Sequence, residues 1–210
     1  MIENFNEALE ILKNHKKIIV TGPQRAGTTI AAKTLAKRLN LEFIDEEEIR
    51  VSNKKLFDQI INERNNFTLQ CPGMPCNIHS IGNREDVFVI FMIRDVYDIL
   101  LSQYRINWNY DQLESKKYIN AGFDVNINIP SSIIKYHIWN QYQKDKIKNK
   151  MELWYECLKT DDMWVDKKDR INFSPKQTFV GQKRQIFVGQ KKPPARTRAQ
   201  RKNKSGFKTL

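Results

Sequence analysis

The apolar positions in the first fifty residues follow two different periods. In residues 4–14 they recur every three or four positions against glutamates, which predicts a short amphipathic helix. An apolar strand over 17–21, a helix over 28–39 and a second strand over 41–44 follow it. A strand, a helix and a strand within fewer than thirty residues are typical of a βαβ unit, so we expect parallel strands.

The rest of the body continues this alternation. The fully apolar run 87–93 is bounded by charge and predicts a strand that is buried on both faces. The other elements expected are a helix around 56–61, a strand over 67–71, a loop with a short helix over 72–82, a helix over 96–106, an irregular excursion over 107–130, a helix over 132–148, and a strand or turn over 152–158. The sequence therefore predicts an α/β fold: a P-loop three-layer fold with a central, mainly parallel sheet flanked by helices.

Between the first strand and the second helix lies a loop bracketed by Gly22 and Gly27, which has the spacing of a phosphate-binding loop. The glycines allow positive φ or close backbone approach, and the amides that open the helix would face an anion. In the ATP- and GTP-binding form of the loop, a lysine follows the second glycine; here Thr28 stands in that position, and Arg25 is the cation of the loop. We therefore expect an anion held by backbone amides and arginine, rather than ordinary nucleotide hydrolysis.

The net charge of +12 is concentrated at the C-terminal end of the chain. Residues 171–210 contain eleven Lys or Arg and no Asp or Glu, so the remainder is almost neutral. We expect one domain over 1–175 and a basic, disordered tail over 176–210, which would bind nucleic acid or other polyanions weakly.

The three cysteines are too few and too unevenly spaced for a disulfide framework, and the three histidines do not show the spacing of a zinc site. No metal is therefore expected. The sequence shows neither a leader segment nor a transmembrane segment, and a cytoplasmic protein is expected.

Two segments together resemble the sulfonucleotide-binding motifs of the P-loop sulfotransferase superfamily, and the chain length is similar to that of its short microbial and phage members. The first segment runs from Gly22 to Thr29, and the second runs from Phe91 through Arg94 to Ser102. Residues 155–158, Tyr-Glu-Cys-Leu, are also similar to a Tyr-Glu-Asp-Leu stretch found late in that fold, with cysteine in place of the acid.

The resemblance implies a sulfotransferase whose cosubstrate is 3′-phosphoadenosine 5′-phosphosulfate (PAPS) and which transfers a sulfuryl group to an acceptor hydroxyl or amine. The 3′-phosphate would be contacted by Arg94 and Ser102. The 5′-phosphosulfate would be contacted by the first motif, which falls on Arg25, Ala26, Gly27, Thr28 and Thr29.

Sulfuryl transfer depends on positioning and on charge neutralisation, and Arg25 would stabilise the departing phosphate. An acceptor alcohol also needs a general base. The resemblance implies a glutamate or a histidine for this role, which points to Glu46 and Glu47 or to His79, and the glutamates are favoured. Acids at that position also suit an ordinary helix N-terminus.

Two other functions fit the same residues. A nucleoside or nucleotide kinase is suggested by the run from Leu35 to Leu41 and by Asp45 and Asp95, which follow strands and could hold magnesium. A non-catalytic protein that binds a phosphorylated ligand is the other alternative. The sequence does not identify the class of acceptor.

Overall fold

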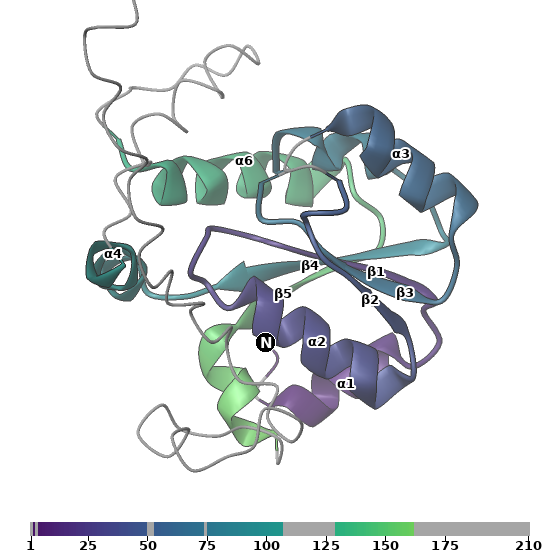
Figure 1. Ribbon diagram of the computed structural model, residues 1–210, viewed down its shortest axis with the longest axis horizontal. Coiled ribbons are helices and arrows are strands. Elements are labelled where there is room, and N and C mark those ends of the chain that lie inside the picture. The colour runs from purple at the N-terminus through teal and green to yellow at the C-terminus, as the bar shows by residue number, and fades with distance from the viewer. Residues whose placement is uncertain (1, 3, 50–52, 74, 107–128, 162–210) are drawn as a thin grey trace, which may run out of the picture.

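The computed structural model describes residues 2, 4–49, 53–73, 75–106 and 129–161. A sheet of five strands lies at the centre of the molecule, with helices on both faces (Figure 1). The strands are β1 (Lys17–Thr21), β2 (Glu42–Ile44), β3 (Phe67–Gln70), β4 (Val87–Ile93) and β5 (Lys150–Trp154). The helices are α1 (Phe5–Leu12), α2 (Thr28–Leu39), α3 (Lys54–Glu63), α4 (Val96–Arg105) and α6 (Ser131–Asp145), with 3-10 helices η1 (Pro75–Ile81) and η2 (Tyr155–Thr160).

The strand order is β2-β3-β1-β4-β5, and each pair of neighbours is parallel. The central strand β1 is in register with both neighbours, so that Ile19 lies between Leu69 and Val89. Because all strands run the same way, the segments that follow them leave the sheet at one edge, here called the carboxyl edge. The loop after β1 and the residues after β4 therefore meet there.

Alternate residues of the strands feed two apolar cores. Ile18 and Val20 face α1 and α2, and Cys157 of η2 closes the same core. Ile19 faces the opposite way, into a core with side chains from α3, η1 and α6. Figure 1 shows these two layers on opposite sides of the sheet, with α4 beyond the carboxyl edge. The run 87–93 is buried as expected, since both faces of β4 are covered.

The α/β fold expected from the sequence is confirmed, and the described strands are parallel throughout rather than mainly parallel. In the stretch 152–158 the expected strand is present, since β5 ends at Trp154, and a 3-10 helix, η2, begins at the next residue where the alternative was a turn. The excursion over 107–128 and the basic tail lie outside the described residues. No helix in the described ranges is long and apolar enough to span a bilayer.

A charged cluster fixes the amino end of β1. The Nζ of Lys17 is buried, lies 3.0 Å from Oδ2 of Asp86 and donates to the carbonyl of Ile61 at 2.9 Å. Arg84 donates two further hydrogen bonds to Asp86. The hydrogen bonds from Arg84 and Lys17 hold the pKa of Asp86 far below its usual value, against the opposing effect of burial.

We expect Asp86→Asn to lower the free energy of unfolding at neutral pH by about 1–3 kcal/mol, since it removes the carboxylate beside a buried ammonium. The lower end of this range is expected because Asp86 is partly exposed. The folded-state pKa is depressed, so the stabilisation is present above the ordinary aspartate pKa of about 4 and disappears as the pH falls through the folded value.

Urea titrations of both proteins between neutral and acid pH measure this difference. Asp58→Asn is the control, because Asp58 forms an exposed pair with Lys54 and its loss should change stability by less than about 0.5 kcal/mol. A difference between wild type and Asp86→Asn that does not shrink in acid would contradict the assignment.

Candidate functional site

The loop after β1 adopts the conformation that its glycines predict. Gly22 has φ of 137° and Gly27 of 93°, both in the region that favours glycine. A Cβ on Gly22 would lie 2.8 Å from the carbonyl oxygen of Met92, so a side chain there would push the loop away from β4. Arg25 also has a positive φ, of 75°, which no feature of the sequence indicated.

The start of α2 faces this loop with its backbone donors. Its N-cap is Gly27, which provides no side-chain cap, and the first helical hydrogen bond runs from the amide of Ala31 to the carbonyl of Gly27 at 3.0 Å. The amides of 28–30 therefore lack an N-cap side chain at the positive end of the helix dipole. Thr28, in the position usually occupied by lysine, is buried.

The two sequence motifs meet at the loop. Nε of Arg25 donates to Oγ of Ser102 at 3.0 Å, although the two residues are 77 positions apart. Nη1 of Arg94 donates to the backbone carbonyl of Arg25 at 2.8 Å. The structure thus brings together the three side chains that the sequence placed in one site, here called the arginine cluster. Their roles toward a ligand remain predictions.

Tyr155 packs against both parts of the site. It is the first residue of η2, and its ring lies beneath the guanidinium of Arg94, whose Cζ is 4.1 Å from the ring centroid. A Cβ added to Gly27 would lie only 2.5 Å from Cδ2 of the same ring. Tyr155 therefore buttresses the loop and Arg94 together. The sequence marked this residue only as part of a late family-like stretch and gave no sign of this contact.

A second tyrosine holds the backbone of Arg94. The hydroxyl of Tyr136, on α6, accepts from the amide of Arg94 at 2.9 Å and donates to its carbonyl at 2.6 Å. Burial raises the pKa of Tyr136 to about 12, although the hydrogen bond with Arg94 acts in the opposite direction. The hydroxyl consequently stays protonated at neutral pH and can donate. Sequence reasoning missed this residue, because a tyrosine in a helix gives no signal of its partner.

The candidate bases lie in different places. Glu46 and Glu47 belong to the turn after β2, at the carboxyl edge, with Glu46 half-buried and Glu47 exposed. The charge of Glu46 adds to the effect of burial in raising the pKa of Cys71, which follows β3, so Glu46 lies near that strand end. The carbonyl of Cys71 in turn accepts from Oγ1 of Thr21, the last residue before the loop.

His79 lies elsewhere. Its carbonyl accepts from the amide of Gly82, and the carbonyl of Gly82 accepts from the amide of Lys148, shortly before β5 begins. This chain of contacts places His79 toward the amino ends of β4 and β5, away from the loop. The geometry therefore favours the glutamates over His79 as a base for chemistry at the loop.

The two carboxylates considered as magnesium ligands both cap local turns. Oδ1 of Asp45 accepts from the amide of Glu47 at 3.2 Å, and Oδ1 of Asp95 accepts from the amide of Asp98 at 3.1 Å, at the N-terminus of α4. In the part of the chain that the structure describes, no group of three or more His, Cys, Asp or Glu residues is arranged to hold a metal ion.

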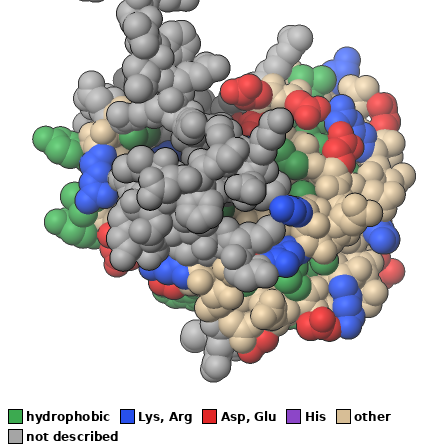
Figure 2. All heavy atoms as spheres, turned by 60° about the horizontal axis from the view of Figure 1, so that its bottom comes forward, with side chains coloured by type: hydrophobic (Ala, Val, Ile, Leu, Met, Phe, Trp, Pro, Cys, Tyr) green, Lys and Arg blue, Asp and Glu red, His purple; other side chains and the backbone are tan. Residues whose placement is uncertain are grey.

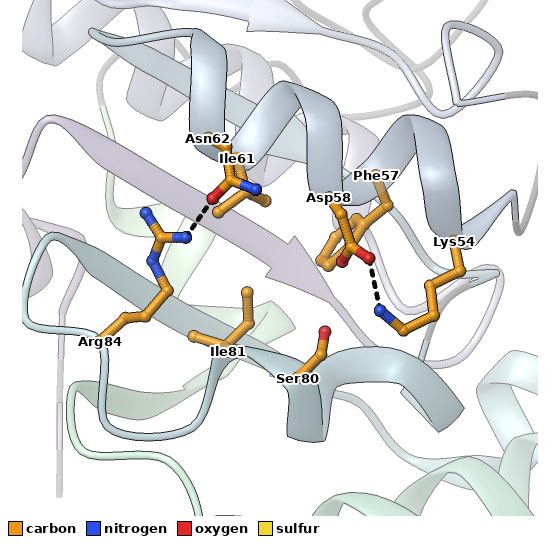
Figure 3. A pocket seen from close by; sticks show the side chains of 8 residues that line it. All are labelled: Lys54, Phe57, Asp58, Ile61, Asn62, Ser80, Ile81 and Arg84. Atoms are coloured by element: carbon orange, nitrogen blue, oxygen red, sulfur yellow. Dashed lines mark hydrogen bonds and ion pairs between the residues drawn. The ribbon is translucent and has the colours of Figure 1, made fainter.

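Two cavities lie near the sheet. One, of about 320 Å³, adjoins the arginine cluster between α6 and the ends of β4 and β5. The other, of about 270 Å³, lies between α3 and η1 (Figure 3). Its charged groups are already paired: Lys54 with Asp58, and Arg84 with Asn62. Because these groups are paired with one another, we interpret this cavity as a structural crevice.

On the surface, basic and acidic side chains are interspersed over the described part of the face in Figure 2.

The chain matches no protein-family model, and no curated protein matches it in sequence. Among solved structures, it is similar to shikimate kinase from Acinetobacter baumannii in complex with shikimate, at 14% identity and a TM-score of 0.43, over 69% of this chain and 87% of that one. It is also similar to shikimate kinase from Aquifex aeolicus, at 16% identity and a TM-score of 0.33, over 60% of this chain and 96% of that one. A third similar structure is an uncharacterized protein from Eubacterium ventriosum, at 14% identity and a TM-score of 0.37, over 66% of this chain and 88% of that one. Similarity at this level does not assign an activity.

The contact between Tyr155 and the loop leads to a stability prediction. Gly27→Ala should lower the free energy of unfolding by about 2–4 kcal/mol, because it combines a left-handed backbone with overpacking against the ring. Gly82→Ala is the matched control: its φ is also positive, at 52°, but the nearest atoms to a Cβ there are 3.8 Å away, so only the backbone contribution remains.

The double variant Gly27→Ala/Tyr155→Ala separates the two contributions in chemical denaturation. Removing the ring should relieve the overpacking, so the effect of Gly27→Ala should become smaller in the Tyr155→Ala background and approach that of Gly82→Ala. Equal effects of Gly27→Ala in both backgrounds would show that Tyr155 does not press on the loop.

Proposed function

We propose that this chain binds PAPS at the loop and transfers its sulfuryl group to an acceptor. The observation that carries the proposal is the arginine cluster: two motifs that resemble those of sulfotransferases, far apart in the sequence, meet at one loop through hydrogen bonds from Arg25 to Ser102 and from Arg94 to Arg25.

The donor set of the loop suits the 5′ end of this cosubstrate. The amides of 28–30 lack an N-cap side chain, and Arg25 adds a permanent positive charge beside them. The 3′-phosphate is assigned to Arg94 and Ser102, which lie on the α4 side of the loop. Arginine suits both tasks because its fork of donors matches the oxygens of a phosphate.

In the proposed reaction the acceptor oxygen attacks sulfur, and a new bond between them forms. The bond from sulfur to the bridging oxygen breaks, and 3′-phosphoadenosine 5′-phosphate leaves with the electron pair. Arg25 and the helix-terminal amides stabilise the charge that develops on the departing phosphate. The proton of the acceptor hydroxyl passes to a base, for which we propose Glu46, with Glu47 as its neighbour.

Phosphoryl transfer is the second candidate. Asp95 lies two residues after the end of β4, the strand paired with β1, so it is at the carboxyl edge, where a magnesium ion bound to ATP would lie. The position after Gly27 weighs against this candidate, since Thr28 cannot provide the charge that lysine gives to an ATP-binding loop.

A thermal-shift experiment distinguishes the two candidates. The product 3′-phosphoadenosine 5′-phosphate should stabilise the purified protein without magnesium, and ATP with magnesium should stabilise it much less. A ligand at one hundred times its dissociation constant adds about 2.7 kcal/mol to the folded state, which gives a measurable rise in Tm. Arg25→Ala should reduce the stabilisation, because it removes a charge-assisted contact worth about 1.5–3 kcal/mol.

Lys13→Ala, at an exposed position after α1, is the control for the loss of one positive charge and should behave like wild type. A larger response to ATP with magnesium, lost in Asp95→Asn, would replace sulfuryl transfer by phosphoryl transfer. A response to neither nucleotide would leave a phosphate-binding protein of another kind.

Arg94 and Ser102 should recognise the 3′-phosphate specifically. Ser102→Ala and Arg94→Ala should bind 3′-phosphoadenosine 5′-phosphate less tightly relative to adenosine 5′-phosphate, and the ratio of the two affinities should fall by about tenfold or more in Arg94→Ala. Calorimetry gives the ratio of the two affinities within each variant, so a general weakening of the site cancels. Variants that keep the wild-type ratio would show that these residues are structural only.

A further inference from the structure

The cavity of about 320 Å³ lies beside the arginine cluster and shares Arg94 with it. It is bounded by the end of β4, by β5 and by α6. Its lining is largely apolar and aromatic, with a few polar groups: Ile93, Arg94, Asp95, Val96, Tyr136, Trp139, Asn140, Glu152 and Trp154. Arg94 is common to this cavity and to the loop site, so the two spaces are neighbours at the carboxyl edge.

Glu152 is the unusual residue of this lining. It lies in the middle of β5, in register with Phe91 of β4. Its neighbours Met151 and Leu153 are buried in the core beneath α1 and α2, so strand alternation turns Glu152 toward the α6 side. Within the described part of the chain, the side-chain carboxylate of Glu152 makes no hydrogen bond or ion pair, although the residue is half-buried. A half-buried carboxylate of this kind is stabilised when a cation binds to it.

The aromatic residues around Glu152 also suit a cation. The indole of Trp139 is fixed by stacking on Phe91, with ring centroids 4.5 Å apart. Trp154 follows Glu152 by two positions on the same face of β5 and is 42% exposed. Aromatic rings can attract organic cations through their faces and do not attract anions in this way.

The one positive group of the lining does not cancel this preference. The guanidinium of Arg94 lies on the loop side, where it donates to the carbonyl of Arg25 and stacks on Tyr155, and its Nη2 is 3.9 Å from Oδ2 of Asp98. Asp95, the remaining charged residue, adds a second negative charge to the cavity. The lining is therefore net negative beside a loop that is suited to anions.

We infer that this cavity binds the acceptor, and that the acceptor is a small organic cation whose ammonium group lies at Glu152 between aromatic side chains. That the bound molecule is the acceptor rests on the proposed function, because a transfer reaction needs its second substrate next to the loop. The cation preference itself depends only on the cavity. An anionic acceptor would meet Glu152 and Asp95 and is disfavoured.

Three probes of the same shape and different charge test the inference: benzylamine, benzyl alcohol and benzoate. Ligand-observed NMR titrations of the full chain should rank benzylamine first, with benzoate weakest. Glu152→Gln, which keeps the shape of the side chain, should weaken benzylamine binding about threefold to tenfold and leave benzyl alcohol unchanged. Glu63→Gln, at the exposed end of α3, removes the same charge elsewhere and should have no effect.

Repeating the titration with saturating 3′-phosphoadenosine 5′-phosphate separates this inference from the proposed function. Benzylamine should still bind, because the two spaces are distinct, and displacement would assign the cavity to the nucleotide and overturn the inference. Equal binding of the three probes, no saturable binding, or no effect of Glu152→Gln would also overturn it. If benzylamine binds through Glu152 while the nucleotide does not bind, the cation site stands and sulfuryl transfer fails.

Discussion

Arg94 is held by contacts from three segments at the carboxyl edge, and the rest of the site depends on it. One hydroxyl, that of Tyr136, bonds to both its amide and its carbonyl, which fixes the chain where β4 ends. Its guanidinium then reaches the carbonyl of Arg25 and lies over the ring of Tyr155. Through this residue α6, η2 and the loop are joined at one point, so a shift of any of them would move the others.

The loop lacks the lysine that follows the second glycine in ATP- and GTP-binding loops, and Thr28 stands in that position. In the proposed function, a phosphate-binding loop without lysine needs another source of positive charge, and we propose Arg25 for it. The backbone of Arg25 is left-handed and lies between two glycines that also have positive φ. Such a conformation is unfavourable for a residue with a side chain. Two hydrogen bonds hold Arg25 in this conformation: its side chain donates to Ser102, and its backbone carbonyl accepts from Arg94. Strain of this kind is often found at functional sites.

Sequence reasoning predicted the fold well because the fold depends on local patterns. The apolar run at 87–93 and the glycines at 22 and 27 each carry their signal in adjacent residues, and the structure places them as expected. The meeting of Arg25, Arg94 and Ser102 could also be expected, since the ends of neighbouring parallel strands share an edge. This required knowing that β4 pairs with β1, which the local sequence patterns do not show.

What the sequence could not show depends on contacts between distant segments. Nothing near Tyr155 indicates that its ring fills the space above Gly27, and nothing near Glu152 indicates a cavity, because both depend on how β5 and η2 pack at the edge of the sheet. The position of His79 away from the loop follows from the path of η1, which a sequence pattern does not define.

In the proposed function, the amides at the start of α2, together with Arg25, hold the phosphate end of a nucleotide. Backbone amide NMR of the full chain during titration with 3′-phosphoadenosine 5′-phosphate tests this most directly, since amides that donate to a phosphate shift strongly. The largest shifts are expected from Gly27 to Ile30, with smaller ones at Arg94 and Ser102. Shifts confined to residues away from the loop, or no shifts at saturating nucleotide, would contradict it.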